Sequence, residues 1–153
     1  MALRKPTRLL LALLFIIGTA VSVSAAAQGS ALAATSCYGS SCYGLSAAQT
    51  TCVKDAKAVS TFNDEDSQIK LYYSPSCRSA WARFVTEDNP EVSPNGWVVQ
   101  SKGEDETCVV KFSGGQYGYG CNTKMVDDAG ATSYAMGFFE FSGVYTSILT
   151  SSY

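Results

Sequence analysis

The sequence predicts an α+β domain that is mainly β: one N-terminal amphipathic helix packed on a six-stranded antiparallel barrel or sandwich, stapled by disulfides. Three observations lead to this prediction. Apolar residues recur at helical spacing over residues 47–62, apolar and polar residues alternate with period two from residue 68 onward, and six cysteines follow residue 33.

Residues 1–33 have the layout of a secretory signal peptide. Arg4, Lys5 and Arg8 precede an apolar run over residues 9–23, and small residues follow that run. The apolar run is shorter than the roughly 20 residues that a membrane-spanning helix needs. The sequence therefore predicts a signal peptide and export of the chain to the extracellular space.

Two cleavage sites fit the small-x-small rule of signal peptides, one after Ala27 and one after Ala33. We favour Ala33, because the first cysteine of the mature chain then follows closely. Cleavage there leaves residues 34–153, which we expect to form a single disulfide-stapled β-rich domain with no stable membrane anchor.

The charge of this mature domain argues against nucleic acid as a partner. The whole chain has 11 basic and 13 acidic residues, and removal of Arg4, Lys5 and Arg8 leaves eight basic residues and a net charge of −5. Nucleic-acid binding depends on cationic contacts to phosphates, and an anionic membrane surface also attracts cations. Neither partner is expected.

The first regular element expected in the mature domain is a helix over residues 47–62. Ser46 and Gln49 match the sequence pattern of a capping box at its start. Five apolar residues repeat at helical spacing and would face the core: Ala48, Cys52, Ala56, Val59 and Phe62. The polar residues 63–67 would end the helix.

Strands are expected from residue 68 to the C-terminus. Ile69, Leu71 and Tyr73 would share one face of the first strand, and Ser74 would begin a turn with Pro75 at its second position. The strand candidates, separated by turns rich in glycine, proline and acidic residues, are 68–73, 80–85, 96–101, 106–113, 117–126 and 133–149.

The cysteines of the mature domain are even in number, and we expect them to form three disulfides. They are Cys37, Cys42, Cys52, Cys77, Cys108 and Cys121. Spacing alone leaves several pairings open, with a slight preference for a Cys52–Cys77 bond that would join the helix to the strand turn. No zinc site is expected, because the chain has neither a C-x2-C pair nor a histidine.

Residues 108–121 are predicted to form a β-hairpin. Gly114 and Gly115 lie between two alternating runs that each end in a cysteine, which favours a disulfide across the strands between Cys108 and Cys121. A nucleotide site is not expected in this loop, because it has no Gly-Lys-Ser/Thr sequence and no helix follows it.

The stretch YSPSCRSAWARF, residues 73–84, combines a proline turn, a cysteine, two arginines and a tryptophan. We interpret it as a structural staple. Cys77 would be half of a disulfide, Trp81 would pack in the core, and Arg83 would stack beside Trp81 or pair with an acidic residue of the chain.

The alternative interpretation of this stretch is a ligand platform, completed by tyrosines of the hairpin. Tyrosine offers a large amphipathic contact surface at low entropic cost. This candidate binding face comprises Arg78, Trp81, Arg83, Tyr117 and Tyr119.

The absence of histidine excludes several kinds of catalysis. Ser-His-Asp and Cys-His nucleophiles, H-E-x-x-H metal sites and imidazole bases all need this residue. A carboxylate pair can hydrolyse glycosides without it, but the acidic clusters 64–66, 104–106 and 127–128 fall in predicted turns, where carboxylates are solvated. We therefore predict no catalytic residue, no cofactor and no metal, and expect that the protein is not an enzyme.

Several motifs of the mature chain together resemble one known family. They are CYGSSCYGLSAAQTTC, the Asp55-Ala56 pair, YSPSCRSAWAR, and TKMVDD followed by YAMG. This combination is similar to the domain of unknown function 2690, DUF2690, the YjfA-like proteins of Gram-positive bacteria. The resemblance implies a small exported protein of undetermined activity. Cys108 and Cys121 look additional to the four cysteines that the family shares, which also suggests that they pair with each other.

Three hypotheses for function remain at this stage. The first is a noncatalytic extracellular or cell-envelope binding domain whose partner is an extracellular protein or a cell-wall glycan. The second is a secreted protein inhibitor that presents a disulfide-rigid loop. The third is a histidine-free carboxylate hydrolase acting on glycans. We favour the first and expect a monomer.

Overall fold

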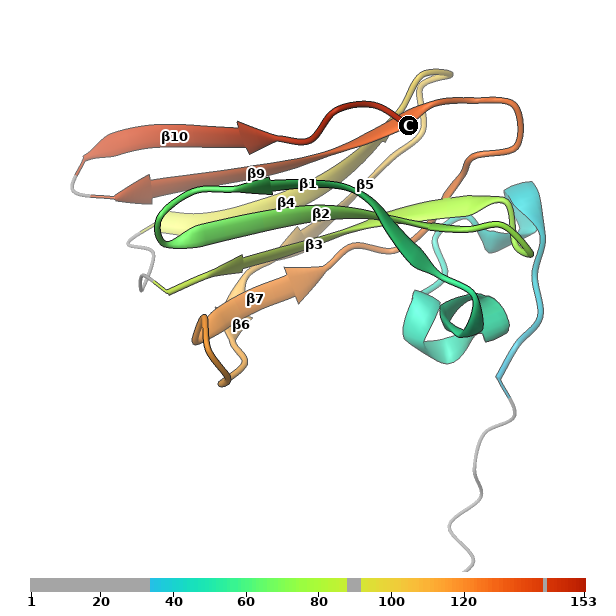
Figure 1. The fold of residues 1–153 in the computed structure, drawn as a ribbon, viewed down its shortest axis with the longest axis horizontal. Coiled ribbons are helices and arrows are strands. Elements are labelled where there is room, and N and C mark those ends of the chain that lie inside the picture. Colours follow the sequence, from blue (N-terminus) through green and yellow to red (C-terminus); the bar gives the residue numbers. More distant parts are fainter. Residues whose placement is uncertain (1–33, 88–91, 142) are drawn as a thin grey trace, which may run out of the picture. The chain divides into compact units, whose positions relative to one another are not determined.

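Two antiparallel sheets form the fold in the computed structural model, which describes residues 34–87, 92–141 and 143–153 (Figure 1). The predicted signal peptide, residues 1–33, lies outside the described residues. Three short 3₁₀ helices precede the sheets: η1 (Gly39–Cys42), η2 (Ala47–Gln49) and η3 (Thr51–Lys54).

The first sheet has the strand order β1-β2-β3-β7-β6, and β8 also pairs with β3. Its strands are β1 (Lys57–Asn63), β2 (Ser67–Ser74), β3 (Ser79–Thr86), β6 (Lys111–Phe112), β7 (Tyr119–Asn122) and β8 (Val126–Asp127). The second sheet has the order β10-β9-β4-β5. Its strands are β4 (Val92–Gln100), β5 (Asp105–Val109), β9 (Ser133–Phe141) and β10 (Val144–Leu149).

The predicted amphipathic helix over residues 47–62 is wrong. Its first half forms η2 and η3, and its second half is the strand β1, which pairs antiparallel with β2 from Lys57↔Tyr73 to Asn63↔Gln68. The segment contains four alanines beside three threonines and two valines, so its composition alone does not decide between helix and strand. Pairing with β2 satisfies backbone groups that a short isolated helix holds only marginally in water.

The prediction of a six-stranded antiparallel barrel or sandwich is corrected as well, because the described residues form no closed barrel but ten strands in two sheets, of six and four strands. Single apolar runs of the sequence divide between strands. The run 106–113 splits into β5 and β6 at Val110, where the chain crosses from one sheet to the other. The run 133–149 splits into β9 and β10, and the run 117–126 into β7 and β8.

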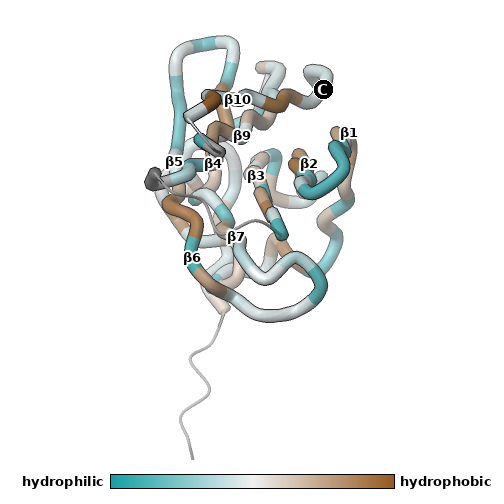
Figure 2. The backbone as a smooth tube through the Cα atoms, turned by 90° about the vertical axis from the view of Figure 1, so that its left-hand side faces the viewer, coloured by the Kyte–Doolittle hydropathy of each residue, from teal (hydrophilic) through white to brown (hydrophobic). Residues whose placement is uncertain are grey.

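The core lies between the inner faces of the two sheets. Figure 2 shows hydrophobic stretches along β2, β3 and β9 that alternate with hydrophilic ones. The buried core residues of the first sheet include Ile69, Leu71, Ala80, Ala82 and Phe84, and those of the second include Val98, Ala135, Phe139 and Ile148. The period-two pattern of the sequence therefore matches the core-facing residues of β2 and β3.

Phe84 projects from β3 onto two glycines of the second sheet. Gly96 and Gly137 are register partners on β4 and β9. A Cβ atom on Gly137 would lie 3.0 Å from Cδ2 and Cε2 of Phe84, and one on Gly96 would lie 3.1 Å from the Phe84 Cβ. The two sheets pack closely at this point because neither glycine has a side chain.

Replacing Gly137 by alanine is expected to destabilise the domain by about 1–3 kcal/mol, because the added methyl group overpacks the Phe84 ring. Urea denaturation followed by tryptophan fluorescence measures the change. Thr61→Ala on the exposed face of β1 is the control and should change the free energy of unfolding by less than about 0.5 kcal/mol. Equal stability of the two variants would show that β3 and β9 are not packed as described.

Three disulfides are present: Cys37–Cys42, Cys52–Cys77 and Cys108–Cys121. The preference for Cys52–Cys77 is confirmed, and that bond joins η3 to the β2–β3 turn. The sulfur atoms of the first four cysteines lie within 4.8 Å of one another, but they are bonded in pairs.

The pairing of Cys108 with Cys121 is confirmed, with Cα atoms 5.8 Å apart, but its setting differs from the prediction. Cys108 lies in β5 of the second sheet and Cys121 in β7 of the first, so the bond joins the two sheets rather than the strands of one hairpin. The hairpin itself is formed by β6 and β7.

Asp55 holds the N-terminal segment against the predicted turn after Ser74. Its carboxylate accepts hydrogen bonds from the Ser74 hydroxyl at 2.6 Å and from the Ser76 N–H at 2.8 Å. The hydrogen bond from Ser74 holds the pKa of Asp55 below its usual range. This contact and the Cys52–Cys77 bond fix the 3₁₀ segment to the end of the first sheet.

Candidate functional site

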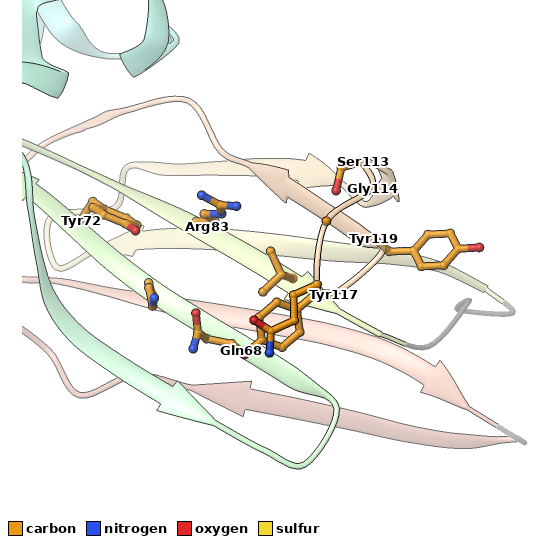
Figure 3. Close-up of a pocket in the computed structure, with 11 residues that line it drawn as sticks. Gln68, Tyr72, Arg83, Ser113, Gly114, Tyr117 and Tyr119 are labelled. Atoms are coloured by element: carbon orange, nitrogen blue, oxygen red, sulfur yellow. The ribbon is translucent and has the colours of Figure 1, made fainter.

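A groove of about 290 Å³ lies on the outer face of the first sheet (Figure 3). We call it the Arg83 groove. β2 and β3 form its floor, and the hairpin that joins β6 to β7 forms its wall. Its lining residues are Gln68, Lys70, Tyr72, Arg83, Val85, Tyr119 and the loop residues 113–117.

The floor of the Arg83 groove follows from strand alternation. Ile69 and Leu71 face the core, so Gln68, Lys70 and Tyr72 point outward from β2. On β3, Arg83 alternates with two buried core residues in the same way and is exposed. These residues meet across the strands because β2 and β3 pair in register from Ser67↔Thr86 to Ser74↔Ser79.

The hairpin wall is shaped by glycines. Gly114, Gly115 and Gly118 have φ angles of 70°, 78° and 68°, a region that glycine occupies without strain. The N–H groups of Ser113 and Gly114 both donate to the Gly118 carbonyl, at 2.8 and 3.0 Å, and close the loop. At its base, a Cβ on Gly120 would lie 3.0 Å from Cγ1 of Val85, so a side chain there would push the hairpin away from β3.

The charges of the Arg83 groove are of one sign. Lys70 and Arg83 are register partners on adjacent strands, and like charges placed directly opposite each other repel. Among the described residues, no aspartate or glutamate lines the groove. In the part of the chain that the structure describes, neither cation forms a hydrogen bond or an ion pair with a carboxylate. An anionic group entering the groove would relieve the repulsion between them.

The structure brings together three of the five residues of the predicted binding face. Arg83, Tyr117 and Tyr119 all line the groove. Figure 3 shows Tyr117 reaching from the hairpin toward Gln68, whereas the Tyr119 ring points away from the other labelled residues. The Tyr119 ring packs edge-on against Phe112, with centroids 5.4 Å apart.

Trp81 is a packed residue beside the groove. Its side chain is only 6% exposed and belongs to a buried cluster with Cys52, Cys77 and Met125. Its indole ring stacks on Tyr72, with centroids 5.6 Å apart and an angle of 9° between the planes. Tyr72 therefore connects Trp81 to the groove floor. Trp81 also lines a separate hollow of about 170 Å³ next to η2.

Arg78 does not line the Arg83 groove. It is the last residue of the β2–β3 turn and has a φ of 52°, and its carbonyl accepts a hydrogen bond from the N–H of Asp128 at 2.9 Å. Burial raises the pKa of Asp128, while a 2.7 Å hydrogen bond from the Ser133 hydroxyl and the charge of Arg78 oppose that effect. The Arg78 Nε finds no hydrogen-bond partner among the described residues.

Three floor residues were missing from the predicted face: Gln68, Lys70 and Tyr72. The period-two pattern of residues 68–73 contained the necessary signal, because it placed them opposite the apolar face. The pairing of β2 with β3 sets Lys70 opposite Arg83, and this register does not follow from the alternation alone.

The acidic clusters lie elsewhere. Residues 64–66 are exposed in the β1–β2 turn, residues 104–106 lie at the start of β5, and residues 127–128 lie at the end of β8. None of them lines the groove. No helix within the described ranges is long and apolar enough to cross a membrane.

The fold and the groove define a class of small, mainly β proteins with two disulfide-linked sheets and an open cationic groove. The chain belongs to the family described as protein of unknown function (DUF2690), which matches residues 40–136. The match includes every residue that lines the Arg83 groove. No curated protein and no solved structure matches the chain.

Proposed function

We propose that the protein is a secreted, noncatalytic binding domain of the extracellular space or cell envelope, and that the Arg83 groove holds its ligand. The observation that carries the proposal is the pair Lys70 and Arg83, two cations on adjacent strands in a groove that no carboxylate of the described residues lines. Repulsion between them lowers stability, and a bound anion would offset that cost.

Export is part of the proposal. The leader of residues 1–33 would be removed after Ala33 to leave the mature domain. Three disulfides are compatible with an oxidising compartment outside the cell. The likeness to the exported YjfA-like proteins of Gram-positive bacteria agrees with this location.

A cell-wall glycan that bears carboxylate or phosphate groups fits the chemistry of the groove. Arg83 can donate two hydrogen bonds to one such group, and Lys70 can add a third. Tyr72 and Tyr117 offer amphipathic rings against which a sugar can pack. The described residues that line the groove include no carboxylate pair of the kind that hydrolyses glycosides, which favours a binding role over a catalytic one.

Replacing Arg83 by alanine is expected to weaken binding to purified cell walls by about tenfold to a hundredfold, because the variant loses one charge-assisted hydrogen-bonding contact. Lys70→Ala should weaken it less. Co-sedimentation with walls at several salt concentrations measures the affinity. Lys57→Ala is the matched control, because Lys57 is an exposed cation on β1 outside the groove.

The outcome that would refute this proposal is wall binding that survives Arg83→Ala and Lys70→Ala unchanged. Failure of the wild-type protein to bind any wall or exposed extracellular glycan would refute it as well. Melting temperatures of the variants must stay close to wild type for the comparison to hold, and the exposure of Arg83 makes this the expected result.

A secreted protein inhibitor is the second candidate, because of the β6–β7 hairpin. The Cys108–Cys121 bond braces its base, and Phe112 is 74% exposed there. A rigid loop with an exposed aromatic residue can enter the site of another protein at low entropic cost. Capture of a secreted enzyme that is lost with Phe112→Ala, but kept with Arg83→Ala, would favour this function over the first.

A further inference from the structure

Four of the six cysteines form one cluster at the end of the first sheet. The Sγ atoms of Cys37, Cys42, Cys52 and Cys77 all lie within 4.8 Å of one another, although each is bonded to only one of the others. Between the two bonds, the Sγ of Cys37 lies 3.5 Å from the Sγ of Cys52. Both atoms belong to disulfides and carry no proton, so this contact is a close approach of two bonds that thiol–disulfide chemistry can couple.

Backbone hydrogen bonds hold the cluster in this arrangement. The Thr51 N–H donates to the Thr35 carbonyl at 3.0 Å, which keeps the segment of Cys37 beside η3. The Gly39 N–H donates to the Cys77 carbonyl at 2.7 Å, which holds η1 against the β2–β3 turn. Figure 1 shows the coiled 3₁₀ segments beside this turn. The four sulfur atoms therefore meet because three separate parts of the chain are fixed to one another.

The four cysteines differ in their access to solvent. Cys42 and Cys52 are completely buried and Cys77 is 2% exposed, whereas Cys37 is partly exposed. A thiol outside the protein can therefore reach Cys37 more readily than the other three. The buried Cys52–Cys77 bond can be reached from within, because the sulfur of Cys37 is in contact with it.

We propose that this cluster is an internal thiol–disulfide exchange site, in which Cys37 is the nucleophile and the Cys52–Cys77 bond is its target. An external dithiol first reduces the Cys37–Cys42 bond: it gives up two electrons and two protons, leaves as a disulfide, and produces two cysteine thiols. The Cys37 thiol then loses its proton, and its thiolate attacks the Cys52 Sγ. A Cys37–Cys52 bond forms, the Cys52–Cys77 bond breaks, and its electron pair leaves on the Cys77 Sγ, which takes up a proton.

The second step is redox-neutral and transfers the free thiol from Cys37 to the buried Cys77. It also removes the covalent link between η3 and the β2–β3 turn. The carboxylate of Asp55, which accepts hydrogen bonds from Ser74 and Ser76, then holds these two elements together without a covalent bond. A dithiol outside the protein thus acts on a bond that it cannot reach itself. The Arg83 groove takes no part in this chemistry.

Replacing Cys42 by alanine tests the exchange step without any reductant, because it leaves Cys37 as a free thiol. Alanine keeps the buried position apolar, and the lost bond joins residues only 5 positions apart, so we expect the variant to fold. N-ethylmaleimide then labels the free thiol. Trypsin yields one peptide that ends at Lys54 and holds Cys37, and another, residues 71–78, that holds Cys77.

We expect about a tenth or more of the maleimide label on Cys77, because the new bond joins sulfur atoms already in contact and both thiols are cysteine side chains. Each exchange event releases the labelled peptide 71–78 from the peptide that ends at Lys54. The rate of labelling at Cys77 should not depend on protein concentration. Label that stays entirely on Cys37, or exchange that requires contact between two molecules, would overturn the proposal.

Cys108→Ala is the matched control, because it also breaks one disulfide and leaves one thiol, on Cys121. Cys121 packs against the main core between the sheets and not in the four-cysteine cluster. Its label should therefore stay on Cys121. If Cys108→Ala moved its label onto Cys77 as readily as Cys42→Ala does, exchange would reflect general unfolding and the assigned site would be wrong.

The wild-type protein gives a second readout that does not depend on the folding of a variant. Limited reduction with dithiothreitol, followed by maleimide, should label Cys42 and Cys77 together in molecules that contain the Cys37–Cys52 bond. Label confined to Cys37 and Cys42 in the partly reduced protein would show that the thiolate does not attack Cys52, and the proposal would fall.

Discussion

Replacing Phe84 by alanine is expected to lower the free energy of unfolding by about 3–5 kcal/mol, a large share of what a domain of this size possesses. Phe84 is completely buried, and its ring packs on Phe139 of the opposite sheet with centroids 5.8 Å apart. Gly96 and Gly137 lie beneath it and have no side chains that could fill the space it leaves. The cavity would therefore stay largely open, which places the loss near the upper end of the range.

Urea denaturation of the oxidised protein measures this loss, with Phe112→Ala as the control. Phe112 is the same residue type on the same sheet, but it is 74% exposed and contacts Tyr119 at the edge. Its removal should cost less than about 1 kcal/mol. If the two variants unfolded at the same urea concentration, Phe84 would not be the centre of the core.

The β strands could be predicted where the sequence pattern was compatible with only one kind of secondary structure. From residue 68 the alternation of apolar and polar residues matches β2 and β3, including the buried Ile69, Leu71 and Phe84. The pattern of residues 47–62 was compatible with both a helix and a strand. Their apolar residues fit helical spacing, but residues 57–63 form an extended strand on β2, and this long-range pairing outweighed the local pattern.

The path of the chain between sheets could not be read from the sequence. Residues 106–113 form one alternating run, and nothing in their spacing marks Val110 as the point where the chain leaves one sheet for the other. For this reason Cys108 and Cys121 were paired correctly but assigned to one hairpin. Tertiary packing determines where the chain crosses from one sheet to the other. That crossing places Cys108 and Cys121 in different sheets, so their disulfide links the two sheets.

The candidate site was predicted only in part, because its residues come together through strand pairing that the sequence does not show. Arg83 and Tyr117 were singled out by residue type, and the fold places both at the Arg83 groove. Lys70 is separated from Arg83 by 13 positions and meets it only through strand register. Arg78 is close to Arg83 in sequence, but the turn conformation at its positive φ directs the chain toward Asp128 instead.

Replacing Trp81 by alanine is expected to destabilise the protein by about 3–5 kcal/mol, as the loss of a buried large aromatic residue does. Trp81 is 6% exposed, and it joins Met125 and the Cys52–Cys77 bond in the buried cluster at the end of the first sheet. The stacked Tyr72 would lose its partner, so the floor of the Arg83 groove would also loosen. Stability and binding are therefore expected to fall together in this variant.

The decisive comparison sets Trp81→Ala against Arg83→Ala. The two residues lie two positions apart on β3: Trp81 is buried, whereas Arg83 is exposed on the groove floor. Arg83→Ala should keep the melting temperature and lose wall binding, whereas Trp81→Ala should lower the melting temperature by many degrees. At temperatures where Trp81→Ala is still folded, it should retain part of its binding, because the two cations remain in place. An unchanged melting temperature with lost binding in Trp81→Ala would instead make Trp81 a ligand contact, and the structural role assigned to the stretch from Tyr73 to Phe84 would be wrong.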